Sequence, residues 1–188
     1  MPYFPGWFAE NLNTSKYNNG DDIPNIQDSG EWSSLDVTET GAWAYFNNDP
    51  DYSWGGPSYT KLYNWYAVND SRSLCPSGWH DPSDAEWTVI TDLLGGQEVA
   101  GYSMKADYGW GGSSYQGSNS SGFSALPGGY RTPNGDFQFE YYCHFWSSSS
   151  FDNWNSWYHY ITPSSDAIDR YPVEKPFGLS VRCLKDTE

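Results

Sequence analysis

The side chains that could perform chemistry in this sequence include three cysteines, three histidines and 24 carboxylates. Cys75, Cys143 and Cys183 show neither a CxxC motif nor the mixed Cys/His spacing of a zinc site. Cys75 and Cys183 lie in apolar, turn-anchored contexts, so they form the better pair for a disulfide in an oxidising compartment, with Cys143 left as a free thiol. The sequence leaves open whether this bridge forms.

The histidines are His80, His144 and His159. No GxSxG elbow or similar strained turn presents a nucleophilic serine to any of them. His80 follows Gly78-Trp79 and is interpreted as a hydrogen-bonded scaffold residue, and His159 as a core residue. No pair among the carboxylates stands out as the acid and base of a glycosidase. These residues favour a protein without catalytic activity.

A different pattern occupies residues 140–182, where Tyr, Asn, Ser and Asp recur at positions that no folding rule dictates. These residue types dominate recognition surfaces, because Tyr offers a large contact area at a small entropic cost and short polar side chains adapt their hydrogen bonds. We predict that the segment binds a ligand through Tyr141, Tyr142, His144, Phe151, Asn153, Asn155, Tyr158, Tyr160, Asp169 and Tyr171.

A strand expected over residues 157–162 must position two of these tyrosines. Alternation with a period of two puts Trp157 and Ile161 on one side, with the histidine between them, and Tyr158 with Tyr160 on the other. If the tryptophan and the isoleucine face the core, both tyrosines face outwards. Neighbouring turns are expected to surround them with Asn153, Asn155, Asp169 and Tyr171.

Signals for other elements are uneven along the chain. A helix is clearest over residues 84–94, where Ser83 and Glu86 form a capping-box pattern and two glycines follow. Its apolar face contains Trp87, Ile90, Leu93 and Leu94. A shorter helix is expected between Trp32 and Tyr45. Short strands are predicted at residues 61–68, 123–126, 129–131, 145–148, 157–162 and 179–184.

Composition excludes several classes of protein. The chain has 188 residues, the length of one domain over residues 1–188, and its net charge of −15 repels nucleic-acid phosphates and anionic lipid. No apolar run approaches the ~20 residues that cross a bilayer. Residues 1–10 lack an export-signal pattern, so we expect a soluble chain without membrane insertion. Aromatic residues make up 19% of the chain against 37% for all hydrophobic ones, so the core must be built from rings.

Several motifs occur in the same order in a known protein family. They are Trp7-Phe8-Ala9-Glu10-Asn11-Leu12-Asn13-Thr14, Lys61-Leu62-Tyr63-Asn64-Trp65-Tyr66-Ala67-Val68, Leu74-Cys75-Pro76-Ser77-Gly78-Trp79-His80, Pro82-Ser83-Asp84-Ala85-Glu86-Trp87, Ser121-Gly122-Phe123-Ser124-Ala125-Leu126-Pro127-Gly128-Gly129-Tyr130-Arg131, Phe145-Trp146-Ser147-Ser148 and Gly178-Leu179-Ser180-Val181-Arg182-Cys183. Over nearly its whole length the chain resembles the Fibrobacter succinogenes major paralogous domain.

This resemblance implies an α+β protein of the C-type lectin-like fold, with two or more helices, short antiparallel strands and long loops. The implied subtype is shared with formylglycine-generating enzyme and with the variable proteins of diversity-generating retroelements. In those variable proteins a Trp-Ser-Ser and Val-Arg framework holds a hypervariable surface, which here implies a variable segment at residues 140–182. The resemblance implies scaffold roles for Trp79, Trp87, Phe123, Trp146, Trp157, Val181 and Cys183.

Metal ligands are the least defined feature of the sequence. Oxygen-rich turns at residues 18–22 and 47–51 offer hard ligands, but neither matches an EF-hand loop. The Glu-Pro-Asn or Gln-Pro-Asp triplet with which sugar-binding C-type lectins hold calcium does not occur. We predict no cofactor and leave a structural calcium ion open.

The resulting hypothesis is a non-catalytic receptor-recognition protein of a cell or virion surface, of the retroelement variable type, which binds a protein or glycan on another cell or particle. Two alternatives stay open. One is an enzyme related to formylglycine-generating enzyme or a hydrolase, which needs a deep pocket with convergent titratable groups. The other is a structural cell-surface module.

Overall fold

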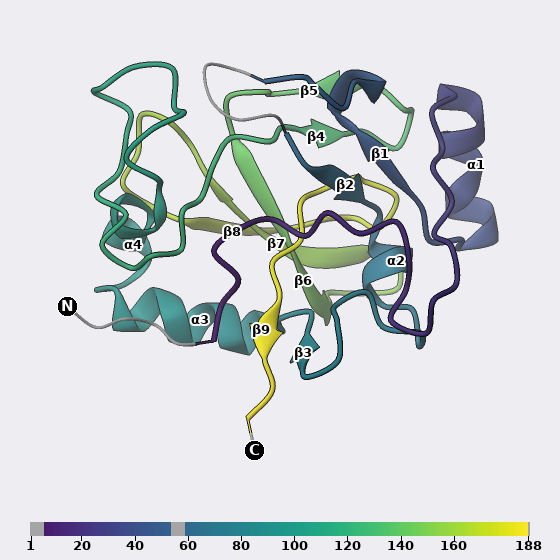
Figure 1. Cartoon of the computed structure of the whole chain (residues 1–188), viewed down its shortest axis with the longest axis horizontal. Helices are drawn as coiled ribbons and strands as arrows, with labels where there is room; N and C mark the ends of the chain where they lie inside the picture. The colour runs from purple at the N-terminus through teal and green to yellow at the C-terminus, as the bar shows by residue number, and fades with distance from the viewer. Residues whose placement is uncertain (1–5, 54–58, 188) are drawn as a thin grey trace.

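The computed structural model describes residues 6–53 and 59–187 (Figure 1). These residues form α1 (Ser29–Thr38), β1 (Trp43–Tyr45), the short 3-10 helix η1 (Phe46–Asn48), β2 (Lys61–Tyr63), α2 (Trp65–Val68), β3 (Trp79–His80), α3 (Asp84–Leu93), α4 (Gln97–Met104), β4 (Tyr130–Arg131), β5 (Phe137–Gln138), β6 (Cys143–Ser150), β7 (Asn155–Ile161), β8 (Asp169–Glu174) and β9 (Leu184–Lys185). Every pairing between these strands is antiparallel, in small sheets. The predicted α+β class with short antiparallel strands is confirmed.

The largest sheet has the strand order β6-β7-β8 and crosses the middle of the molecule (Figure 1). Its register pairs Phe145 with His159 and Tyr158 with Tyr171. The face of Phe145 and His159 packs against Trp87 of α3, with ring centroids 5.6 and 4.8 Å apart. Because side chains alternate along a strand, the face of Tyr158 and Tyr171 is turned away from α3.

Helix α3 begins as the sequence predicts. The Ser83 hydroxyl accepts the Glu86 N–H, and the Glu86 carboxylate accepts the Ser83 N–H, which completes the capping box. Trp87 is fully buried on the inward face. The predicted place of Leu93 on that face is wrong, because Leu93 is 64% exposed. Leu94 takes the inward position at the end of the helix and packs against the core.

The helix expected between Trp32 and Tyr45 is α1, but its predicted bounds are wrong. It begins earlier, at Ser29, and ends at Thr38. Residues 43–45 form strand β1 instead and pair with β2. Pairing with a distant segment supplies the hydrogen bonds and the burial there, so it overrides the helical spacing of the apolar residues.

The strand predicted over residues 61–68 is wrong in its second half, where α2 replaces it. Asn64 causes the change. Its side-chain oxygen accepts the N–H of Ala67, which caps α2, and the N–H of Ala42, at 3.1 and 2.9 Å. One buried amide therefore ends the strand and starts the helix.

Strands predicted at residues 129–131, 145–148 and 157–162 are confirmed as β4, β6 and β7. The strands predicted at residues 123–126 and 179–184 are wrong. The first segment makes one isolated β-bridge, and the second makes isolated β-bridges before the short strand β9 begins at Leu184. The sequence patterns did not indicate α4 or β8. Gly101 lies inside α4 and Pro172 inside β8, and these residue types argue against a helix and a strand respectively.

Gly101 lets α4 dock closely on the chain that precedes β8. A Cβ at this position would lie 2.3 Å from the Ala167 carbonyl oxygen. Alanine is the better helix former by up to about 1 kcal/mol. We nevertheless expect Gly101→Ala to lower the free energy of unfolding by about 1–3 kcal/mol, because the two backbones must move apart. Urea denaturation followed by tryptophan fluorescence measures this change.

Gly112→Ala is the control, since its Cβ would meet only the Tyr115 ring at an ordinary 3.5 Å. Equal losses in the two variants would contradict the docking role of Gly101.

Tryptophan rings build the core and also hold the loops. Their indole N–H groups donate to backbone carbonyls far away in sequence, namely Trp32 to Pro176, Trp43 to Ile23, Trp65 to Ser147, Trp87 to Trp146, Trp110 to Ala125 and Trp146 to Tyr63. Each bond pairs polar groups that burial would otherwise leave unsatisfied. The predicted aromatic core therefore also fixes the long loops.

Two buried arginines hold further loops in the same way. Arg131 donates to the carbonyls of Ile26, Gln27 and Gly135. Arg182 donates to the Asn11 side-chain oxygen and to the carbonyls of Phe8, Phe123 and Ser124. Neither guanidinium forms an ion pair with a carboxylate of the described residues. Each is a buried cation held by neutral oxygens.

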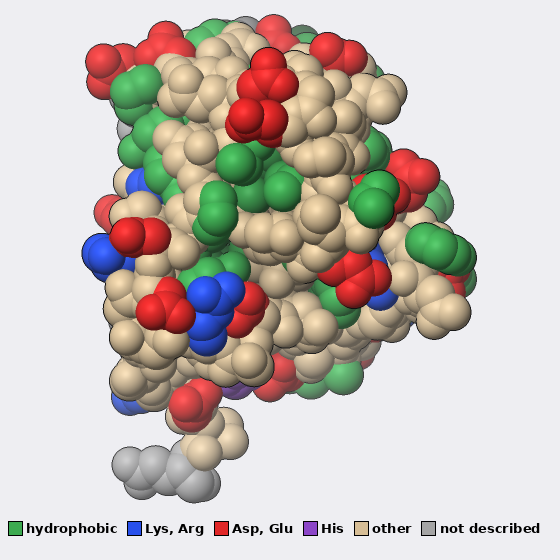
Figure 2. Space-filling view, turned by 90° about the vertical axis from the view of Figure 1, so that its right-hand side faces the viewer, with side chains coloured by type: hydrophobic (Ala, Val, Ile, Leu, Met, Phe, Trp, Pro, Cys, Tyr) green, Lys and Arg blue, Asp and Glu red, His purple; other side chains and the backbone are tan. Residues whose placement is uncertain are grey.

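The surface agrees with the composition. Asp and Glu side chains outnumber Lys and Arg on the face shown in Figure 2 and are spread over all of it. Within residues 6–53 and 59–187 no helix has the length and apolar character that would let it cross a membrane.

Candidate functional site

A row of partly exposed tyrosines crosses the sheet on the face turned away from α3. We name Tyr142, Tyr160 and Tyr171 the tyrosine ladder. Tyr142 directly precedes β6, and the other two lie on β7 and β8. The ring centroids of Tyr142 and Tyr160 are 6.5 Å apart with an interplanar angle of 8°, and those of Tyr160 and Tyr171 are 6.2 Å apart. Hydrogen-bonded strands position these rings, so their spacing follows from the sheet itself.

Tyr158 lies on the predicted side of β7, but it is half-buried. Its ring stacks on Tyr160 at 5.7 Å and packs against the core cluster that contains Trp146. Burial first, and then the neighbouring tyrosines, raise the pKa of Tyr158 to about 12. Of the two tyrosines predicted to face outwards together, Tyr160 is available to a ligand and Tyr158 supports it. Tyr141 contacts Tyr142 at 4.9 Å and extends the ladder at that end.

The prediction that His144 lies on the surface is wrong. This residue is 4% exposed, and its ring lies among Tyr130, Tyr142, Tyr158 and Tyr160. Burial lowers the pKa of His144 to about 3, so the imidazole is neutral at physiological pH. The strand predicted over residues 145–148 did not include it, and the aromatic rings packed over it come from three separate segments, β4, the residues ahead of β6, and β7. His144 supports the ladder from beneath.

Asp169 places a carboxylate beside the ladder. It is the register partner of Tyr160 across β7 and β8, and the Gln97 amide donates to it at 3.5 Å. Burial, followed by the charge of Asp169, raises the pKa of Tyr160. The phenol therefore stays protonated, and its oxygen can accept a hydrogen bond from a ligand. A carboxylate beside phenol groups favours partners that bring hydrogen-bond donors or positive charge.

Phe151 and Asn153 belong to the turn between β6 and β7, residues 151–154, which we name the hairpin tip. Phe151 packs edge-on against Trp157 at 4.8 Å, on the opposite face of the sheet from the ladder. Asn153 accepts a hydrogen bond from Lys175 through its carbonyl oxygen, at 3.0 Å. Asn155 was predicted in a turn, but it begins β7. Its side-chain amide donates to Asp152.

The ten predicted site residues therefore do not form one patch. Asn155 and Tyr160 are five residues apart on one strand, which corresponds to roughly 16 Å. Tyr141, Tyr142, Tyr160, Asp169 and Tyr171 form one group, with His144 and Tyr158 beneath it. Phe151 and Asn153 at the hairpin tip and Asn155 at the start of β7 form another. Asp169 and Tyr171 were expected in turns, but they lie on strand β8.

Trp154 is a surface residue that the sequence reasoning missed. It is 73% exposed at the hairpin tip, whereas tryptophans were assigned to the core as a class. The available signal was its setting between Asn153 and Asn155, two residues that favour turns.

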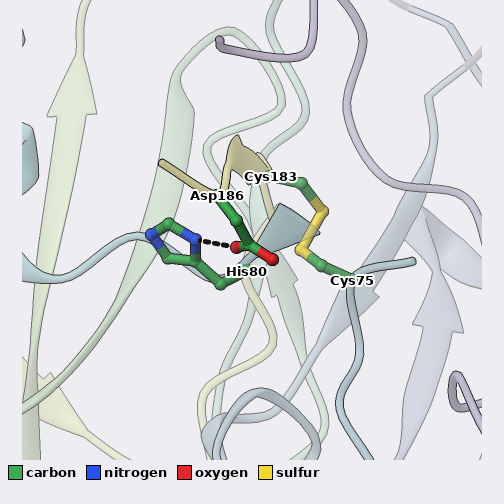
Figure 3. Close-up of a disulfide and its surroundings, with 4 residues drawn as sticks. All are labelled: Cys75, His80, Cys183 and Asp186. Carbon is green, nitrogen blue, oxygen red and sulfur yellow. Dashed lines mark hydrogen bonds and ion pairs between the residues drawn. A yellow bond between two sulfur atoms is a disulfide. The ribbon is translucent and has the colours of Figure 1, made fainter. Parts of the chain in front are cut away.

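The disulfide between Cys75 and Cys183, which the sequence left open, is present, and it lies beside His80 (Figure 3). Cys143 is free and fully buried. Burial raises the pKa of the Cys143 thiol to about 12, which keeps it protonated and makes it a poor nucleophile.

The other histidines lie close to carboxylates. The Nε2 atom of His159 lies 3.4 Å from a carboxylate oxygen of Asp84, and its ring stacks on Trp87, which confirms it as a core residue. Burial lowers the pKa of His159. In the part of the chain that the structure describes, no three His, Cys, Asp or Glu side chains are grouped to hold a metal ion.

His80 joins two separate elements and carries the pH dependence we expect. Its Nδ1 atom lies 2.7 Å from Asp186, after β9 (Figure 3). Its Nε2 atom lies 2.9 Å from Glu86 of α3. Burial opposes the charged form, but the bonds to Asp186 and Glu86 outweigh it and raise the pKa of His80. Its stabilising effect is therefore complete below the unfolded-state pKa of about 6.5 and is lost as pH rises through the folded-state value.

We expect the free energy of unfolding to fall as pH rises above about 6.5, and His80→Gln to remove that part of the slope. Denaturant titrations at several pH values measure it. Burial raises the pKa of Asp81 to about 7, so this carboxyl also lowers the free energy of unfolding as pH rises, over a lower pH range. Asp81 is present in both proteins, so the difference between their slopes comes from His80. Identical slopes in the two proteins would contradict the role of His80.

Comparison with known families matches residues 6–185 to the family model of the Fibrobacter succinogenes major domain. Comparisons with curated proteins and with solved structures find no match. The match covers the ladder, the hairpin tip and the disulfide, and it extends over nearly all described residues. On this match, the chain belongs to the Fibrobacter succinogenes major domain family.

Proposed function

We propose that this protein is a non-catalytic recognition domain whose tyrosine ladder binds a protein or glycan on another cell or particle. The observation that carries the proposal is the row Tyr142, Tyr160 and Tyr171, of which the last two lie on neighbouring strands and the first directly precedes the third strand of the same sheet. Tyrosines on a rigid backbone lose little entropy on binding and combine an apolar ring with a hydrogen-bonding tip. The net charge of −15 and the carboxylate of Asp169 favour a neutral or basic partner.

We also propose a C-type lectin-like fold and a retroelement variable protein, with residues 140–182 as the segment that varies. The ladder and the hairpin tip both fall within this segment, while Trp146 and Arg182 are buried as its frame. Gene copies that differ at ladder and tip codons but keep the two buried residues would support this assignment. Copies that differ mainly at buried codons would contradict it.

The Cys75–Cys183 bridge supports a location outside the cytoplasm, at a cell or virion surface, because disulfides persist in oxidising compartments. The enzyme alternative has less support, since the free thiol of Cys143 is buried and protonated.

The test is the double variant Tyr160→Ala/Tyr171→Ala. We expect its free energy of unfolding to stay within about 1 kcal/mol of wild type, because both rings lie at the surface of the sheet. Peptides selected on the wild-type protein from a phage-displayed random library, and hits on a glycan array, are expected to bind the variant at least about tenfold more weakly, or ~1.4 kcal/mol.

Tyr115→Ala is the matched control, because this exposed tyrosine lies outside the ladder and the hairpin tip. Tyr158→Ala is expected to destabilise the fold by about 2–3 kcal/mol, since it removes a half-buried ring. The proposal fails if selected peptides and array hits bind the ladder variant as strongly as wild type.

A further inference from the structure

A second concave site lies away from the tyrosine ladder and the hairpin tip. It is a cavity of about 330 Å³ between the N-terminal segment at residues 9–11, the chain ahead of β2 and the loop at residues 124–127. No ladder or hairpin-tip residue lines it. Its volume lies at the lower end of the roughly 300–1,000 Å³ range of small-molecule sites.

Arg182, whose guanidinium is held rigidly, is one of the residues that line the cavity. This side chain is 1% exposed and donates four hydrogen bonds, to Asn11, Phe8, Phe123 and Ser124. An arginine has five N–H donors, so one has no acceptor among the described residues. Burial lowers the pKa of Arg182 to about 9, but the group stays charged at neutral pH. The cavity therefore has a fixed, positively charged donor in its lining.

Aromatic and hydroxyl groups form other parts of the lining. Tyr108 contributes an exposed ring and Tyr59 a buried one. The Tyr59 hydroxyl donates to the Glu140 carbonyl, which fixes its ring. The hydroxyl of Thr60 is buried and has no hydrogen-bond partner in the described part of the chain. These groups offer apolar ring faces together with an unused hydroxyl.

Glu10 places an exposed carboxylate in the same lining as the Arg182 cation. An anionic ligand would be repelled by Glu10, and a cationic ligand by Arg182, so the pair favours a ligand without net charge. The ligand must also donate to the carboxylate, accept from the guanidinium and present an apolar face to the tyrosines.

We infer that this cavity binds one neutral sugar residue, without a metal ion. A pyranose ring carries hydroxyls that both donate and accept, and its C–H face packs on an aromatic ring. The site is separate from the tyrosine ladder, so it adds a small-molecule function to the proposed recognition surface.

The experiment uses the whole chain with excess EDTA and a panel of glucose, galactose, mannose, xylose and N-acetylglucosamine, observed by saturation-transfer difference NMR. At least one sugar is expected to bind with a dissociation constant of about 1 mM. Tyr108→Ala and Glu10→Gln are expected to weaken that sugar at least about tenfold, or ~1.4 kcal/mol. Anionic glucuronate and cationic glucosamine are both expected to bind more weakly than glucose, the neutral sugar to which they correspond.

Tyr115→Ala is the matched control, since Tyr115 is 42% exposed and Tyr108 48%, and only Tyr108 lines the cavity. Sugar binding is also expected to survive in Tyr160→Ala/Tyr171→Ala, which separates this site from the ladder. The inference is overturned if no neutral sugar of the panel binds, if Tyr108→Ala binds as well as Tyr115→Ala, or if free phenylalanine, a zwitterion, competes with the sugar for the cavity.

Discussion

Arg182→Met is expected to lower the free energy of unfolding by about 3–5 kcal/mol. The guanidinium joins the N-terminal segment, through Phe8 and Asn11, to the loop at Phe123 and Ser124. Methionine keeps much of the apolar contact but leaves one buried and three partly buried acceptors without this donor, and an unpaired buried acceptor costs about 1–3 kcal/mol. Water that enters the neighbouring cavity satisfies some of these acceptors. The expected loss is therefore small compared with the full cost of four unpaired acceptors.

Arg182→Lys tests whether charge alone is sufficient. A lysine ammonium has three donors on a flexible stem and cannot reproduce the planar fork, so we expect a loss close to that of Arg182→Met. Arg72→Met is the control, because Arg72 pairs at the surface with Asp70 and Asp21, and exposed pairs contribute about 0–1 kcal/mol. Urea denaturation measures all three proteins. A loss below about 1 kcal/mol in Arg182→Met would show that these bonds do not hold the loops.

Cys75→Ala/Cys183→Ala is expected to cost about 4–5 kcal/mol of stability. The bridge joins residues separated by 108 positions, so it excludes many extended conformations of the unfolded chain. Closure of a loop of ~100 residues is worth about 4.7 kcal/mol in the chain-entropy account. A domain of this size is stable by only about 5–15 kcal/mol, so the double variant is expected to be close to unfolding at 37 °C.

The measurement compares urea midpoints with and without dithiothreitol. Wild type and Cys143→Ala are expected to lose stability when reduced, because Cys143 takes no part in the bridge. The double variant is expected to be insensitive to reductant. If reduction leaves the wild-type midpoint unchanged, the bridge does not stabilise the native state.

The division of the candidate site into a ladder and a hairpin tip changes how recognition should be tested. Tyr160 and Phe151 were expected on one surface because both lie in the segment of residues 140–182. The antiparallel hairpin places them near opposite ends of β7 and on opposite faces of the sheet. A ligand the size of a peptide reaches one group, while a folded partner that contacts both must also cover the edge strand β8.

Local sequence patterns were sufficient where neighbouring residues decide the structure. The capping box at Ser83 and Glu86 and the two glycines after α3 predicted that helix, because a cap and a stop act within a few residues. Alternation over residues 157–162 predicted β7 and the side of the sheet on which Tyr160 lies. The motif order also predicted the family that the match over residues 6–185 confirms.

Elsewhere the decisive contacts come from distant segments. Residues 43–45 become a strand because β2 pairs with them, and α4 tolerates Gly101 because it docks on Ala167. The sequence predicted which side of its strand a residue occupies, but not how deeply neighbouring segments cover it.

The sequence alone therefore determined the family, the aromatic core, helix α3 and the residue types of a recognition segment, since these depend on composition and on spacing along the chain. Only the tertiary structure decided that His144 is buried under four aromatic rings, that Trp154 is exposed, and that Tyr142, Tyr160 and Tyr171 line up in one row. Exposure and alignment are set by segments that pack together across the fold, and local periodicity carries no information about those partners.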